Sequence, residues 1–154
     1  MNEEKFTEFK EDFALLIETC FIAVKQMDEI SALRIFACAQ ALSVLNTAPK
    51  IGLGFIAINK LEIKEATRIF QSVVDVEPEN YLAQTFLGIC ALLTKGKRSK
   101  GEKLIQEAMA KTTDSTIKNL GATSLQWAEK DLSKKSSAPF FAGQNDEPEN
   151  EDKK

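Results

Sequence analysis

The 154-residue chain contains no histidine and only three cysteines. The missing histidine removes the commonest metal ligand and the commonest general base, which excludes His-based triads and Cys/His zinc sites. Cys20, Cys38 and Cys90 are far apart and each lies in an apolar helical pattern, so we expect small packing residues in a reducing compartment. We therefore expect no catalytic residue, no cofactor and no bound metal, and we predict that the protein is not an enzyme.

Long apolar runs are missing as well. No run approaches the roughly 18–20 residues that a membrane-spanning helix needs, so we expect no membrane insertion. The segment "MNEEKFTEFKED" at the start is acidic and mixed, without the basic and apolar regions of a secretory signal. Together these absences predict a cytoplasmic protein.

Outside the C-terminal end the chain has no excess of acidic or basic side chains. Residues 136–154 hold five carboxylates and two lysines, which leaves 18 acidic and 18 basic side chains in residues 1–135 and places the whole net charge of −3 in the tail. A neutral body is a poor electrostatic match for nucleic acid or anionic lipid, so we expect no nucleic-acid partner. The basic segment "KGKRSKGEK", 95–103, lacks interleaved aromatic residues and is interpreted as a solvated loop.

The composition divides the chain into two parts. Residues 1–133 show apolar positions at i, i+3, i+4 and i+7, with turn signals such as "EPEN" at 77–80 and "TTDST" at 112–116 that cut the pattern into helix-sized segments. Residues 134–154 are rich in Ser, Pro, Asn and acids and are expected to form a disordered, acidic tail. The sequence therefore predicts an all-α domain followed by a tail that is dispensable for folding, unless Phe140 and Phe141 dock in the groove described below.

Two motifs recur with a period of 34 residues: Leu-Gly at 53–54 and 87–88, and Ala-x-x-x-Phe at 32–36 and 66–70. This pattern resembles the tetratricopeptide repeat, in which two antiparallel helices pack closely around small residues. The positions assigned to repeat packing are Ala32, Phe36, Leu53, Gly54, Ala66, Phe70, Pro78, Leu87 and Gly88.

The resemblance implies three degenerate helix pairs, at about 13–46, 47–80 and 81–114, in a right-handed solenoid. A C-terminal capping helix follows near 114–133, with Trp127 expected on its packed face. In the third pair, Gly101, Ile105 and Ala108 take the small, large and small positions of the second helix. The stretch "IGLGFIAIN", 51–59, is then a helix whose glycines serve packing, because a phosphate loop would need a preceding strand and a third glycine.

The first helix of each pair has more apolar positions than its own packing needs. At about 100° per residue these positions form a second stripe, which in a tetratricopeptide solenoid lines the concave groove. The predicted groove residues are Ala14, Ile17, Phe21, Val24, Ala48, Ile51, Phe55, Ile58, Leu82, Thr85, Ile89 and Leu92.

A large apolar groove indicates a binding surface, and its shape suits an amphipathic helix. Three alternatives stay open: the N-terminal segment folds into the groove, the acidic tail does so, or the chain dimerises through it. Grooves that hold a C-terminal carboxylate need basic residues and Asn at the inner positions, where only Lys25 and Asn59 come near, so that kind of partner is not expected.

The size, the three degenerate repeats, the capping helix and the apolar groove resemble the small tetratricopeptide chaperones of bacterial type III secretion. The segment "TKGKRSKGEKLIQEAMAKTTDSTIKNLGATSLQWAEKDL" is most similar to the branch that chaperones the needle subunit. That resemblance implies a bacterial, cytoplasmic protein that holds an amphipathic helix of the secreted subunit, together with a small co-chaperone, as a heterotrimer. Two other functions remain open: a class II chaperone of hydrophobic translocators, and a tetratricopeptide adaptor outside secretion.

Overall fold

The structure, a computed structural model, describes residues 3–26, 28–43 and 45–131, and the side chains of this part from residue 12 to residue 130. Within these ranges the chain forms seven helices and no strand, which confirms the prediction of an all-α fold. The helices are α1 (Glu3–Lys25), α2 (Glu29–Leu42), α3 (Ala48–Asn59), α4 (Ile63–Val76), α5 (Tyr81–Leu92), α6 (Arg98–Lys111) and α7 (Ser115–Asp131).

Polar caps explain where several helices begin. The Asp28 carboxylate accepts a hydrogen bond from the Ser31 amide at 3.1 Å, and the Asn80 side chain accepts one from the Ala83 amide at 3.0 Å. Each bond satisfies an amide that has no partner within the first turn of its helix. Pro49 lies in the first turn of α3, where a missing amide hydrogen is tolerated.

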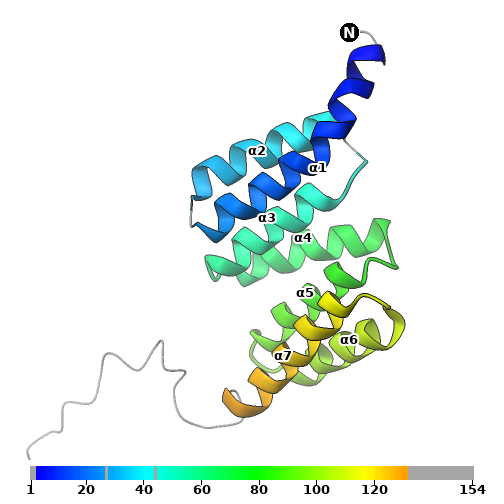
Figure 1. Ribbon diagram of the computed structural model, residues 1–154. Coiled ribbons are helices and arrows are strands. Elements are labelled where there is room, and N and C mark those ends of the chain that lie inside the picture. The colour runs from blue at the N-terminus through cyan, green and yellow to red at the C-terminus, as the bar shows by residue number, and fades with distance from the viewer. Residues whose placement is uncertain (1–2, 27, 44, 132–154) are drawn as a thin grey trace, which may run out of the picture.

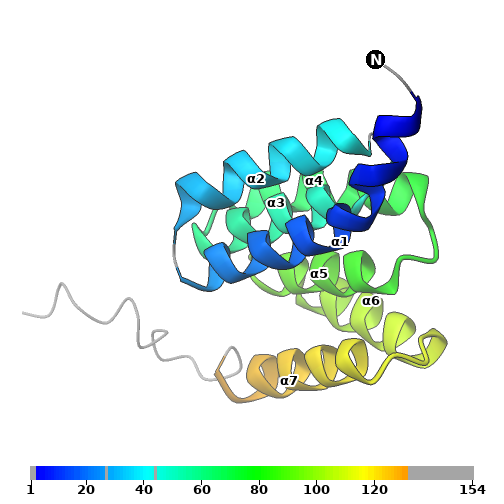
Figure 2. The same cartoon turned by 45° about the horizontal axis from the view of Figure 1, so that its top comes forward.

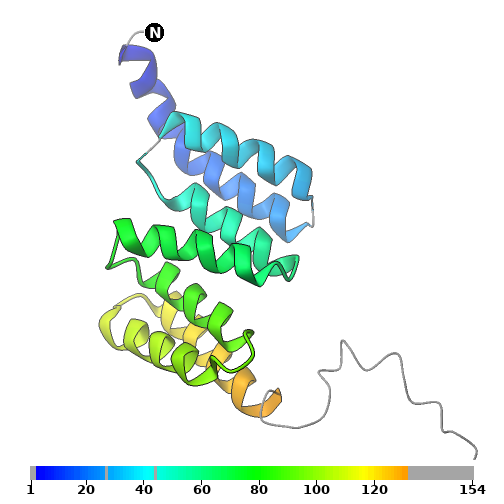
Figure 3. The same cartoon turned by 180° about the vertical axis from the view of Figure 1, so that it is seen from behind.

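The helices pack in chain order. α1 packs on α2, α3 on α4, and α5 on α6, while α7 contacts both α5 and α6. The two N-terminal helices lie at one end of the stack and α7 lies at the other (Figure 1, Figure 2). Seen from behind, α3 and α4 occupy the middle, between the blue N-terminal pair and the yellow and orange C-terminal helices (Figure 3).

Two glycines let α3 approach both of its neighbours. A Cβ atom on Gly52 would lie 1.9 Å from Cζ of Phe36 in α2, and one on Gly54 would lie 2.6 Å from Cζ of Phe70 in α4. No side chain fits at such distances, so the two phenyl rings pack directly on the α3 backbone. Gly54 and Phe70, both predicted as packing residues, lie against each other, and Gly52 adds an equivalent contact with Phe36.

The backbones of α5 and α6, the third helix pair, approach each other equally closely. A Cβ atom on Gly88 in α5 would lie 2.6 Å from Cγ1 of Ile105, and one on Gly101 in α6 would lie 2.7 Å from the carbonyl oxygen of Gly88. Gly101, Ile105 and Ala108 are buried, as predicted for the small, large and small positions of this pair.

The core divides into three clusters along the stack. Phe36 and Cys20 belong to the N-terminal cluster, Phe70 to the central one, and Ile105 and Ala128 to the C-terminal one. Four predicted packing residues of the first two clusters, Ala32, Phe36, Ala66 and Phe70, are each 0% exposed, whereas Leu53 is partly buried against the N-terminal cluster. The first two clusters each join side chains from two helix pairs, and the third joins the α5–α6 pair to α7, because no pair buries both of its faces alone.

Two predicted packing residues need correction. Pro78 is exposed in the turn between α4 and α5, where its carbonyl accepts a hydrogen bond from the Gln84 side chain. Its role is to end a helix, since proline after the last turn cannot continue it. Trp127 is 37% exposed, and Ala128 is the residue of α7 that reaches the core, because one residue along a helix turns a side chain by about 100°.

The turn between α3 and α4 contains a left-handed residue that is not glycine. Leu61 has φ of 59°, its amide donates to the Ile58 carbonyl, and the Glu62 amide donates to the Ala57 carbonyl. These two bonds form the capping motif that usually places glycine at this position. The turn brings α4 back along α3, which sets the Gly54–Phe70 contact.

Residues 132–154 lie outside the described part, and with them the predicted acidic tail, 134–154, and its two phenylalanines. Among the helices that the structure describes, none combines the length and the apolar character required to cross a bilayer.

Candidate functional site

The structure separates the twelve predicted groove residues into two groups. Val24, Ile51, Thr85 and Leu92 are buried, so they belong to the packing between helices and cannot line an open surface. The prediction that they line a groove was wrong for a physical reason. A helical wheel treats each helix in isolation, whereas in the structure the neighbouring helices cover one edge of the predicted groove positions. Leu92, for example, packs in the cluster formed with Ile105 and Ala128.

The remaining eight residues keep part of their surface accessible to solvent. Together with Phe86 we call them the apolar stripe: Ala14, Ile17, Phe21, Ala48, Phe55, Ile58, Leu82, Phe86 and Ile89. They come from α1, α3 and α5, whose axes cross the stack in the same direction (Figure 1).

The α1 part of the stripe rests on the N-terminal cluster. Phe21 is 37% exposed, and its ring meets the ring of buried Phe36 edge to face, with the centroids 5.7 Å apart. Ile17 is half-buried against the same cluster. Phe36 therefore supports the accessible Phe21 on one side and the backbone of Gly52 on the other.

An aromatic chain joins α3 to α5. The rings of Phe55 and Phe86 lie 5.7 Å apart at a tilt, and Phe86 stacks on buried Phe70 with the centroids 5.0 Å apart. Such ring pairs add to the stabilisation from buried area. Phe86 was missed in the sequence because its counterpart 34 residues earlier is Gly52, which has no side chain to reveal the position.

Every partly buried member that packs on a core cluster presents one side to the core and the other to solvent. Ile58, Leu82 and Phe86 rest on the central cluster, Ile17 and Phe55 on the N-terminal one, and Ile89 on the C-terminal one. The core therefore fixes their positions while their outer surfaces stay available. Such an arrangement can bind apolar surface without first reorganising.

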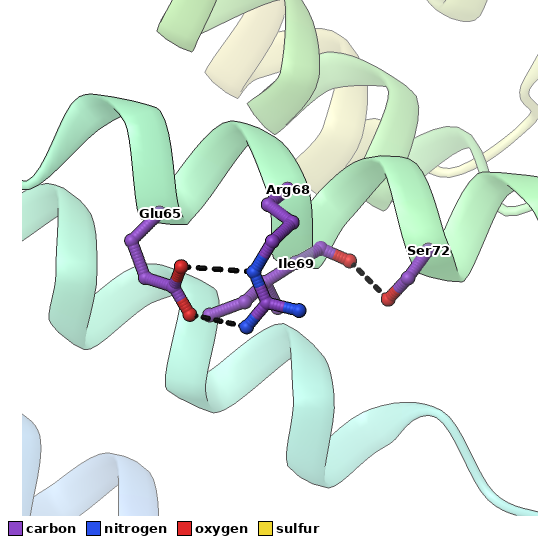
Figure 4. Close-up of polar contacts among 4 residues, drawn as sticks. All are labelled: Glu65, Arg68, Ile69 and Ser72. Atoms are coloured by element: carbon purple, nitrogen blue, oxygen red, sulfur yellow. Dashed lines mark hydrogen bonds and ion pairs between the residues drawn. The ribbon is translucent and has the colours of Figure 1, made fainter.

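An ion pair lies on α4. Arg68 Nε donates to Glu65 Oε2 at 2.9 Å, and the Ser72 hydroxyl donates to the Ile69 carbonyl one turn further on (Figure 4). The hydrogen bond from Arg68 lowers the pKa of Glu65 and raises the pKa of Arg68. No member of the stripe titrates, so the stripe offers shape and apolar area and no acid–base chemistry.

Two of the three thiols are inert by burial. Desolvation raises the pKa of Cys20 and of Cys90 to about 11, while Cys38 is exposed on α2. Within the described residues no cluster of three or more Cys, Asp or Glu side chains is arranged to hold a metal ion.

A second apolar surface lies on the N-terminal helix pair. Its members are large side chains of α1 and α2 that are at least 40% exposed: Leu15, Ile22, Ile30 and Leu33. On α1, Leu15 and Ile22 are seven residues apart and share one side of the helix, away from the buried Cys20.

No protein-family model matches the chain, and no curated protein matches it either.

Proposed function

We propose that the protein is a tetratricopeptide-like chaperone of bacterial type III secretion that acts in the cytoplasm. In this proposal the helix pairs form a right-handed solenoid, and the apolar stripe lines its concave groove. The groove holds the amphipathic helix of a secreted needle-type subunit, and a small co-chaperone completes a heterotrimer. The single observation that carries the proposal is the row of accessible apolar side chains on α1, α3 and α5.

The continuity of the stripe supports a long partner over a small ligand. Ile17 and Phe55 share the N-terminal cluster, and Phe55 touches Phe86, which rests on the central cluster. An amphipathic helix presents apolar side chains at i, i+3, i+4 and i+7, and a long helix that repeats this spacing can contact α1, α3 and α5. Apolar burial of this kind stabilises a complex by about 25 cal/mol per Å² before the ordering costs are subtracted.

The mechanism is sequestration without chemistry. A subunit that polymerises through an apolar helix is prone to aggregate before export, and covering that helix keeps the subunit monomeric. The second apolar surface, on α1 and α2, leaves room for the co-chaperone on a part of the molecule outside the stripe.

The test is the Phe55→Glu substitution, assayed by co-purification with a candidate needle-type subunit. Phe55 lies in the middle helix of the stripe, and central aromatic residues often contribute about 2 kcal/mol or more, which corresponds to a roughly 30-fold weaker complex. The matched control is Gln106→Glu, which adds the same charge at an exposed position of α6.

Thermal melting of each variant alone separates a binding defect from a folding defect. We expect Phe55→Glu to melt near the parent temperature and to lose the subunit, while Gln106→Glu keeps it. Retention of the subunit by a normally folded Phe55→Glu protein would contradict the proposal. If Phe55→Glu does not fold, Leu82→Ser provides the same comparison with a smaller change.

A further inference from the structure

A pocket of about 250 Å³ opens between α4, α5 and α6. Its lining includes four apolar side chains, Val74, Leu87, Ala91 and Leu104, and the uncharged polar side chains of Thr67, Gln71 and Thr94; the space admits a phenylalanine ring. The stripe does not extend into it: at about 100° per residue, Leu87 and Ala91 lie on the side of α5 opposite to Ile89. The pocket is therefore a second, separate site.

Two of the side chains that line this pocket are charged, and both belong to lysines, Lys97 and Lys100. They belong to the most basic stretch of the chain, 95–103, in which Arg98 already pairs with Glu102 at 2.7 Å. Within the described residues no ion pair joins Lys97 or Lys100 to a carboxylate. A partly apolar lining with a cationic rim favours a ligand that carries an apolar anchor next to acidic groups.

The chain itself contains such a ligand outside the described residues. Phe140 and Phe141 are followed by the acidic stretch 146–152, which holds five carboxylates. No other segment of the chain combines paired aromatic residues with an acidic run of this length.

The C-terminal segment begins at the end of α7 that lies near the pocket. Because α5, α6 and α7 follow one another through short connections and alternate in direction, the C-terminal end of α7 lies at the same end as the α5–α6 loop that carries Lys97 (Figure 1). Packed helix axes are 8–10 Å apart, so a chain that passes around α6 must cover about 20 Å. The eight residues 132–139 span up to about 27 Å when extended, which is sufficient.

We propose that this pocket binds the protein's own C-terminal segment. One phenylalanine of the 140–141 pair packs on the apolar side chains of the lining, and carboxylates of 146–152 face Lys97 and Lys100. The inference does not depend on the proposed chaperone function, because the occupied side of α5 is the one opposite to the stripe.

The test is zero-length carbodiimide crosslinking of the full chain, which joins lysine amines to nearby carboxylates, followed by peptide mapping. We expect crosslinks from Lys97 or Lys100 to residues 146–152 at low ionic strength. They should be lost at about 1 M salt, where the screening length falls to about 3 Å. They should also be lost in the double variant Phe140→Ser/Phe141→Ser and kept in the control Gln144→Ser/Asn145→Ser, which changes neither an aromatic nor a charged residue.

Hydrogen exchange of the same variants supplies a readout that does not depend on the lysines. Loss of the anchor should speed exchange in residues 67–74 and 97–104 and leave residues 48–59 unchanged. Equal crosslinking to lysines across the surface, or exchange that is the same in the anchor and control variants, would overturn the proposal. Protection confined to 48–59 would overturn it in favour of tail binding to the stripe. Crosslinks between isotopically distinct copies alone would overturn it in favour of a second chain.

Discussion

Replacing Gly52 by alanine tests how closely α3 is held. The added Cβ would lie 1.9 Å from Cζ of Phe36 and 2.3 Å from Cε1, so the ring has to move. Phe36 is 0% exposed and surrounded by the N-terminal cluster, which means that its movement displaces other core side chains. Overpacking of this kind costs about 1–3 kcal/mol, and the better helix propensity of alanine returns about 0.5–1 kcal/mol.

We therefore expect Gly52→Ala to lower the free energy of unfolding by about 1–2 kcal/mol. For a domain of this size each kcal/mol shifts the melting temperature by about 4 °C, so the variant should melt roughly 4–8 °C below the parent. The assay is thermal unfolding, monitored through the circular dichroism of the helices at 222 nm.

Gly121→Ala is the matched control. Its Cβ would meet Met109 Sδ at 2.6 Å and Ile105 Cγ2 at 3.0 Å, and a methionine side chain can move aside more easily than an enclosed phenyl ring. We expect this variant to melt closer to the parent temperature than Gly52→Ala does. A double-mutant cycle with Phe36→Leu adds a second check, because the smaller side chain should absorb much of the Gly52→Ala cost. Equal melting of Gly52→Ala and the parent would show that the α2–α3 packing described above is wrong.

Three further predictions concern packing, capping and titration. Gly54→Leu should destabilise the fold by about 1–3 kcal/mol or more, because its side chain must displace the Phe70 ring; chemical denaturation measures this, and an unchanged midpoint would contradict the α3–α4 contact. Asn80→Ala should cost about 1 kcal/mol through loss of the α5 cap, whereas Asn80→Ser, which keeps an acceptor and adds no charge beside Glu77, should cost less in the same assay. The raised pKa of Cys20 and Cys90 means that these thiols contribute stability below their ordinary pKa of 9.0 and that this contribution is lost as the pH rises toward about 11. Melting temperatures from pH 8 to 11 should therefore fall less steeply in Cys20→Ala than in the parent, and parallel curves would refute the assignment.

The sequence predicted the parts of the fold that depend on local signals or on the repeat. Asp28 and Asn80 mark helix starts by their chemistry, and the 34-residue period identified Gly54 and Phe70 as packing positions. One period after Gly52 and Phe36 the chain has Phe86 and Phe70, so the period matches a glycine to a phenylalanine and reveals neither the Gly52–Phe36 contact nor the place of Phe86. Both become visible only when helices from different pairs are placed side by side.

The candidate surface was predicted less completely because it depends on packing between units. A helical wheel assigned Thr85 to an open groove, but the structure leaves it 0% exposed with its hydroxyl donating to the Tyr81 carbonyl. For Trp127 the prediction was wrong in the other direction. Its size and apolar character favour burial, but its place on α7 leaves the side chain partly exposed to solvent. The direction of a side chain relative to neighbouring helices is a property of the assembled fold.

The position of α3 between Phe36 and Phe70 has a consequence for the rate at which a partner binds. Glycine backbone lies against a ring on each side, so α3 cannot slide or turn by one residue without driving a side chain into one of the rings. Phe55, which lies on this helix, is therefore held in one position before any partner arrives. If the proposed partner helix binds the stripe, its association needs no slow rearrangement of α3, and differences in affinity among such helices should be expressed mainly in their dissociation rates.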